Sequence, residues 1–141
     1  MRDIDQISGD VLDAAIRLHR ELGPGLLETV YETVLAAQLA RAGYEVDRQY
    51  PVDIDVDGLH FAAAFRIDIL VDKRLLIEIK SVDQLHASHA KQLLTYIRLT
   101  KQPVGLLINF GGATLMEGFR RLVNDYRAPL STEPAPIIRE V

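Results

Sequence analysis

The segment that decides the fold is FRIDILVDKRLLIEIK, residues 65–80. Apolar and polar residues alternate on both sides of the DKR triplet, which predicts two antiparallel strands joined by a turn. Because successive side chains of a strand point to opposite faces, Ile67, Ile69 and Val71 are expected on one face of the sheet. Arg66 and Asp68 are expected on the other face.

Matching the apolar rows of the two strands predicts their register. The rows agree when Val71 lies opposite Leu75 and Ile69 lies opposite Ile77, which leaves residues 72–74 as the loop. A shorter loop would mix polar with apolar residues on each face. The register predicts a polar pair one step further along, in which Asp68 faces a glutamate.

That pair, Asp68 and Glu78, points to metal chemistry. Directly opposed β carbons lie roughly 4.5–5.5 Å apart, and like charges at that distance repel. Two such carboxylates need a counter-charge or a shared proton. An all-oxygen site suits Mg²⁺, with Mn²⁺ as a substitute. Lys80 follows on the same face, where it would orient a water or stabilise charge developing on a phosphate. The alternative is a solvated strand face with a weak ion pair.

The rest of the chain predicts a mixed α/β domain with helices packed on a central sheet. The order is helix, helix, three strands, helix, strand, with a further short strand near 118–123. The second helix is expected to bury Leu27, Val30, Val34 and Ala37. Helices are expected over 8–22, 26–41 and 87–100, and strands over 52–56, 60–71, 75–80 and 104–110.

Composition narrows the class of protein. The chain has 141 residues, enough for one domain with one core. It contains no cysteine, which excludes disulfides and Cys-based zinc sites and fits a cytoplasmic protein. A net charge of −4 argues against a protein that coats nucleic acid, but not against an enzyme that cuts it. No segment is apolar enough to span a membrane or to act as a signal peptide. We expect one domain over 1–128 and a mobile tail over 129–141.

Taken together, these motifs resemble the PD-(D/E)XK nuclease superfamily, whose core is restriction-endonuclease-like. Asp68 and the run Glu78-Ile79-Lys80 carry the resemblance, although Ile67 stands where the family name has proline. The segment GLLETVY, residues 25–31, matches the signature of the GxxExxY branch. The resemblance extends through residues 92–96 and 105–111 and covers about 8–125.

The resemblance implies roles for individual residues. Asp68, Glu78 and the Ile79 carbonyl would bind the metal, with Glu28 as an additional acidic ligand, and Lys80 would be the catalytic lysine. Gln92 and Tyr96 resemble a Gln-x-x-x-Tyr motif that follows the lysine in RecB-like nucleases. Further residues are candidates on position or charge, and packing or a solvated surface is the alternative for each. They are Arg66, Lys91, Tyr96 and Arg98 for nucleic-acid binding, and His89 and Tyr31 for an unassigned role at the site.

The sequence therefore predicts a metal-dependent nuclease that uses metal-activated water, with DNA favoured over RNA as its substrate. Two alternatives stay open. The first is a nuclease-fold binding or regulatory module within a larger complex, because fold alone does not establish activity. The second is a small-molecule phosphohydrolase. A protein partner or homo-oligomer also stays open.

Overall fold

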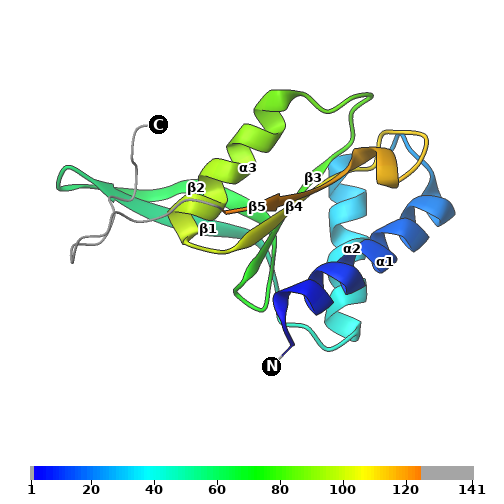
Figure 1. Cartoon of the computed structure of the whole chain (residues 1–141), viewed down its shortest axis with the longest axis horizontal. Coiled ribbons are helices and arrows are strands. Elements are labelled where there is room, and N and C mark those ends of the chain that lie inside the picture. Colours follow the sequence, from blue (N-terminus) through cyan, green and yellow to red (C-terminus); the bar gives the residue numbers. More distant parts are fainter. Residues whose placement is uncertain (1, 125–141) are drawn as a thin grey trace.

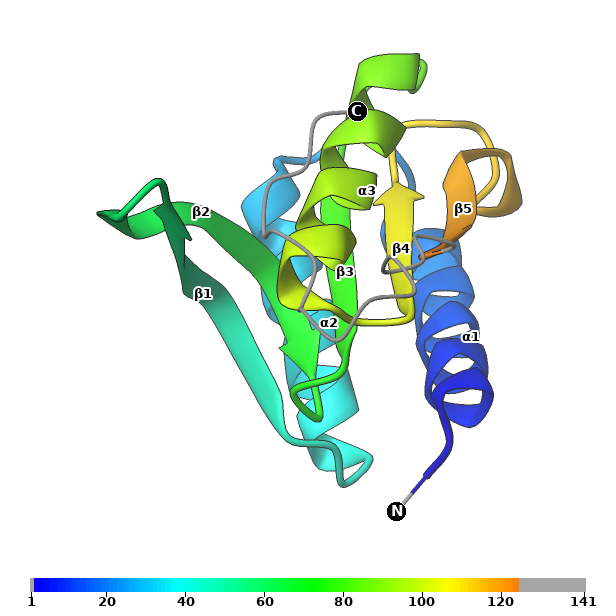
Figure 2. The ribbon, with the colours of Figure 1, turned by 60° about the vertical axis from the view of Figure 1, so that its left-hand side comes forward.

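The computed structural model describes residues 2–124, which form a five-stranded sheet with helices on both faces (Figures 1 and 2). The strand order is β1-β2-β3-β4-β5, and all neighbours are antiparallel except β3 and β4. The expected mixed α/β fold is confirmed. The elements are α1 (Ile4–Leu22), α2 (Glu28–Arg41), β1 (Val46–Val56), β2 (Leu59–Val71), β3 (Leu75–Lys80), α3 (Ala87–Thr100), β4 (Val104–Asn109), a 3₁₀ turn (Met116–Gly118) and β5 (Phe119–Val123).

The turn chemistry sets the register of the antiparallel meander. Asp57 and Gly58, both at positive φ, close the β1–β2 hairpin as a two-residue turn. Val71 pairs with Leu75 and Ile69 with Ile77, so the predicted β2–β3 register and its three-residue loop are confirmed. β4 reaches its parallel place beside β3 through the crossover helix α3.

Helices cover the two faces of the sheet unequally. α1 and α2 pack on the face that carries Ile69, Val71, Ile77 and Ile79. α3 alone packs on the opposite face, and Figure 2 shows it on the near side of the sheet with α2 behind. The face of β3 that carries Glu78 and Lys80 is therefore covered by a helix and is not a solvated surface.

The buried face of α2 differs from the expected one. Leu27 is 77% exposed, Val30 and Ala37 are also exposed, and Val34 is half-buried. The buried stripe is instead Tyr31, Leu35 and Leu39, at i, i+4 and i+8. Leu27 has extended backbone and occupies the N-cap position, so the helix begins at Glu28 rather than at 26. Apolar residues lie nearly all round this helix, so periodicity alone does not choose the face.

The alternation of β2 breaks at Asp68. Ile67 was expected beside Ile69, but it packs under α3 with Leu70 and Leu76. Opposite Asp68 the β1 partner is Gln49, whose φ of 51° is left-handed, and these two residues form no ladder pair. The interruption rotates the strand, so the residues before and after Asp68 face opposite sides of the sheet.

The outer halves of β1 and β2 extend beyond the helices as a two-stranded arm (Figure 1). β1 is longer than predicted, because it begins at Val46 rather than at 52. None of the helices among residues 2–124 is long and apolar enough to cross a bilayer. The expected tail, 129–141, lies outside the described residues.

Candidate active site

Asp68 and Glu78 lie side by side where β2 and β3 stop pairing. The Asp68 backbone N–H donates to Glu78 Oε1 at 3.4 Å, and the Ile79 N–H donates to Asp68 Oδ2 at 2.9 Å. The pairing of β2 with β3 runs from Val71 and Leu75 to Ile69 and Ile77, so the Asp68 carboxylate replaces the next backbone partner. The structure brings together the two carboxylates that the register argument pairs.

The environment of Glu78 disfavours its charged form. Its residue is 5% exposed, and burial followed by the negative charge of Asp68 raises its pKa to about 9. Lys80 lies near enough to oppose part of this shift. A buried carboxylate beside a second carboxylate favours uptake of a proton or a cation.

Tyr96 contributes to the wall of the site from α3. Burial, then the charges of Glu78 and Asp68, raises the pKa of its phenol. Its ring stacks on Phe65 with the centroids 4.1 Å apart and the planes 9° from parallel. One face of the ring is therefore occupied by Phe65 and is not open to a stacked base.

Glu28 and His89 lie on the Lys80 side of the site. Burial first, and then the charge of Lys80, lowers the pKa of His89, whereas Glu28 acts to raise it. His89 Nδ1 accepts the His86 backbone N–H at 3.1 Å. Glu28 is exposed in the first turn of α2. The structure therefore places Glu28 near His89 and does not join it to Asp68 or Glu78 by a hydrogen bond among the described residues.

Sequence reasoning missed a second acidic residue, Glu32, one turn further along α2. Glu32 is 5% exposed and accepts from Arg48 Nε at 3.1 Å and from Gln49 Nε2 at 3.0 Å. Gln49 Nε2 also donates to Asp68 Oδ1 at 3.2 Å. Burial, then the charge of Asp68, raises the pKa of Glu32 against the opposing effect of Arg48. The i, i+4 spacing of Glu28 and Glu32 was the available signal.

Tyr31 has a structural role. Its hydroxyl donates to the Gly23 carbonyl at 2.5 Å and accepts the Leu26 N–H at 3.2 Å, and its ring stacks on Phe110. Gly25, at φ 98°, supplies the left-handed residue of the same loop. In the GLLETVY segment, Gly25 and Tyr31 thus shape the connection between α1 and α2.

Hydrogen bonds hold the loop after β3 to the α1–α2 connection and to β4. Ser81 Oγ donates to the Leu26 carbonyl at 2.6 Å. The buried Asn109 side chain accepts from Val82 N and donates to Val82 O, both at 2.9 Å. A β carbon on Gly111 would lie 2.1 Å from Val82 O, so only glycine fits there. These contacts fix the chain that follows Lys80.

The expected nucleic-acid contacts lie on the surface. Lys91, Gln92 and Arg98 are exposed on α3, and Arg66 is exposed on β2. Lys91 and Arg98, seven residues apart, share one helix face.

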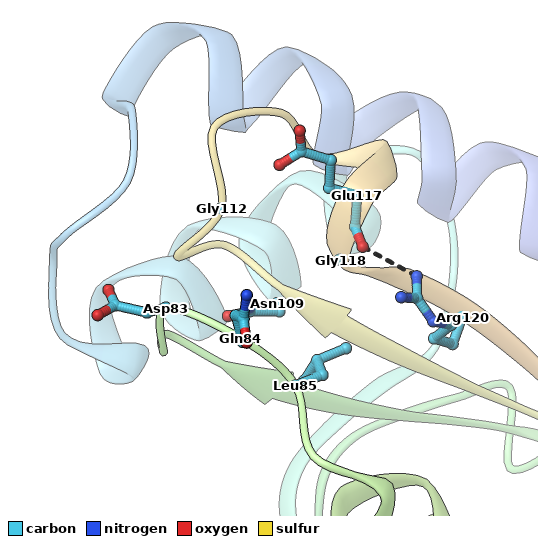
Figure 3. Close-up of a pocket in the computed structure, with 8 residues that line it drawn as sticks. All are labelled: Asp83, Gln84, Leu85, Asn109, Gly112, Glu117, Gly118 and Arg120. Atoms are coloured by element: carbon cyan, nitrogen blue, oxygen red, sulfur yellow. Dashed lines mark hydrogen bonds between the residues drawn. The ribbon is translucent and has the colours of Figure 1, made fainter.

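Two cavities lie apart from the carboxylate pair. One, of about 320 Å³, opens at the carboxyl ends of β3 and β4 (Figure 3). Asp83 and Gln84 line it from one side and Glu117 and Arg120 from the other, and Arg120 donates to the Glu117 carbonyl at 2.9 Å. The other lies on the apolar face of the arm. Neither is lined by Asp68 or Glu78.

The oxygen ligands around Asp68 and Glu78 fit a divalent cation that keeps some of its coordinated water. Within residues 2–124, no three His, Asp or Glu side chains lie close enough to hold an ion by themselves. Asp68 and Glu78 supply two carboxylates. The Ile79 carbonyl points to the same side as its N–H, towards Asp68. Mg²⁺ is typically bound by one or two carboxylates together with water and substrate phosphate, so this set suffices.

Residues 5–122 match the family model of the PD-(D/E)XK nuclease superfamily. The chain belongs to this superfamily. Membership supports a nuclease-type activity and a nucleic-acid substrate, and PD-(D/E)XK nucleases generally use divalent metals. Comparisons with curated proteins and with solved structures gave no significant match.

Proposed function

We propose that this PD-(D/E)XK protein is a Mg²⁺-dependent nuclease of the GxxExxY branch that hydrolyses phosphodiester bonds of DNA in preference to RNA. The observation that carries the proposal is the buried Glu78 against the half-buried Asp68, with Lys80 beside them. Burying like charges together without a counter-charge destabilises a fold, so a functional cation is the simplest reason to keep them. The GLLETVY segment supports the choice of branch.

Each residue has a distinct task in this mechanism. Asp68 and Glu78 bind the cation, with the Ile79 carbonyl as a further oxygen donor. A bound divalent cation supplies Lewis-acid polarisation of the phosphate and activates water as the nucleophile. The Lys80 ammonium stabilises negative charge that develops on the phosphate, as a preorganised donor does at other hydrolytic sites.

Basic side chains on the surface would bind the nucleic-acid substrate. Lys91 and Arg98 on α3 and Arg66 on β2 contact backbone phosphates, and Gln92 contacts the substrate from the same helix. Contacts of this kind release counterions, so nucleic-acid binding without metal should weaken as salt rises. Binding that does not change with salt would argue against these contacts.

The test is a cleavage assay on plasmid, single-stranded DNA and RNA with Mg²⁺ or Mn²⁺, comparing the wild type with Asp68→Ala. Metal-dependent cleavage of DNA that Asp68→Ala abolishes supports the proposal. Preferential cleavage of RNA would correct the substrate. Salt-sensitive binding without cleavage at any metal concentration would contradict the nuclease mechanism and favour a nucleic-acid-binding module.

A further inference from the structure

Gln49 adopts a backbone conformation that strands avoid. It lies inside β1 with φ 51°, although glutamine has a β carbon that disfavours the left-handed region. Such conformations persist where the surrounding structure over-determines them, and they cluster at functional sites. The conformation interrupts the β1–β2 ladder opposite Asp68.

In this position the side chain of Gln49 contacts two carboxylates. Its Nε2 donates both to Glu32 Oε1 at 3.0 Å and to Asp68 Oδ1 at 3.2 Å. An amide nitrogen carries two hydrogens, so a single group can serve both carboxylates without adding charge. A carboxylate at this position would repel both neighbours, and an apolar side chain would remove the hydrogen bonds that Gln49 donates to Glu32 Oε1 and Asp68 Oδ1.

The other end of the bridge is anchored. Glu32 is buried and forms an ion pair with Arg48, whose Nη2 lies 3.0 Å from Glu32 Oε2 and 2.9 Å from Thr33 Oγ1. The other oxygen of Asp68 accepts from Ile79 N at 2.9 Å. Both oxygens of Asp68 are therefore held, one by the backbone of β3 and one through Gln49 by α2.

We propose that Gln49 is a positioning residue, which holds the carboxylate of Asp68 in place by bridging it to Glu32, a buried residue that is itself paired with Arg48. The inference rests on the proposed function, because it assigns Asp68 to the cation. The left-handed backbone brings the amide to Asp68, and the Glu32–Arg48 pair keeps it there. Partners that orient a metal ligand typically change metal affinity or activity 10–100-fold when they are lost.

The experiment uses two substitutions of Gln49 and one matched control. Gln49→Gly removes the amide and relieves the backbone strain, whereas Gln49→Met removes the amide and keeps the length of the side chain. Ala63→Gly is the control, because Ala63 is also left-handed at φ 51° in the same hairpin but lies on the exposed arm. The measurements are the Kd for Mn²⁺ by calorimetry, kcat and KM on DNA, and the melting temperature.

We expect Gln49→Gly to melt at or above the wild-type temperature while its Mn²⁺ affinity and kcat fall about 10–100-fold, with KM unchanged. Gln49→Met should lose affinity and kcat to the same extent. Ala63→Gly should keep both. Wild-type Kd and kcat in Gln49→Gly, in an assay where Asp68→Ala is inactive, would overturn the inference and leave the proposed function intact.

A double-mutant cycle distinguishes failure of the Gln49 bridge from failure of the proposed nuclease function. Urea unfolding of Gln49→Met, Asp68→Ala and the double mutant reports their interaction without any cleavage or metal. Non-additive unfolding free energies are expected, since the two side chains are in contact. Additive values would overturn the bridge itself. If the wild type neither cleaves nor binds Mn²⁺ but the coupling is present, the proposed function fails while the bridge stands as a structural one.

Discussion

The β1–β2 hairpin carries acidic residues at both of its ends, and the two groups behave differently. At the outer end Asp53 and Asp55 flank His60, whose ring nitrogens lie 3.5 Å and 2.8 Å from their carboxylates, and all three are exposed. At the inner end Asp68 lies against Glu78, which is buried. Solvent exposure and a histidine screen the outer group, whereas burial of Glu78 beside Asp68 favours uptake of a proton or a cation. Acidic residues alone thus do not define the site; their removal from water does.

The largest contrast should appear in catalysis. Asp68→Ala removes an inner ligand, and we expect cleavage of DNA to fall by about 10³-fold, at the upper end of what one lost electrostatic stabiliser does. Asp55→Ala, the outer counterpart, should cleave at the wild-type rate. Initial rates on one DNA substrate at saturating Mg²⁺ measure both. Equal losses in the two variants would remove the distinction between the groups.

Lys80→Ala should have the next largest effect. It removes the positive charge beside Glu78, so cleavage should fall by about 10²-fold. Metal affinity should survive or rise, because a cation that competes with the metal is lost. Lys73→Ala is the control, since Lys73 is exposed on the β2–β3 turn and pairs with Asp47 of β1. A Lys80→Ala enzyme with full activity would exclude Lys80 from the reaction.

Stability without metal should depend on pH through Glu78. Because folding raises the pKa of Glu78 from 4.5 to about 9, the stability that its protonated form contributes is complete below pH 4.5 and is lost as pH rises towards 9. Glu78→Gln should weaken this slope, leaving the variant more stable than the wild type at pH 8 by about 2 kcal/mol or more. Urea unfolding in EDTA at pH 5 and pH 8 measures it. Parallel slopes in the two proteins would contradict the assigned burial.

The smallest effect should come from His60→Ala in the outer group. Asp55 raises the pKa of His60, so its stabilising contribution is present below pH 6.5 and is lost as pH rises through the folded-state value. The melting temperatures of wild type and variant should differ slightly at pH 5.5 and coincide at pH 8.5. Cleavage should not change. A difference that grows with pH would reverse the assigned sign.

Local rules account for what the sequence predicted correctly. The β2–β3 register followed from apolar rows, and the Asp57-Gly58 turn from its left-handed residues. The bounds of α3 were predicted residue for residue. The proximity of Asp68 to Glu78 follows from the register of this short hairpin, so it could be predicted without the rest of the fold.

What sequence reasoning missed depends on tertiary contacts. The buried face of α2 was assigned wrongly, because apolar residues lie on most sides of that helix. Ile67 was placed on the wrong face, because the interruption at Gln49 is invisible in an alternating pattern. Glu32 and Gln49 were missed because only the folded structure brings α2 and β1 together beside Asp68. A helical glutamate and a strand glutamine are ordinarily surface residues, and only the packing of α2 buries Glu32.

The short β2–β3 connection also bears on the order in which the protein folds. Asp68 and Glu78 are ten residues apart in the chain, and a loop of that length closes in roughly 10–100 ns. β4, by contrast, reaches β3 only after the α3 crossover, and non-local pairing of this kind is slow. The two carboxylates should therefore meet early, in water, where their repulsion is weak. That repulsion opposes the late step in which α3 and β4 bury Glu78, so a cation present during folding should speed this step and leave nucleation of the hairpin unchanged.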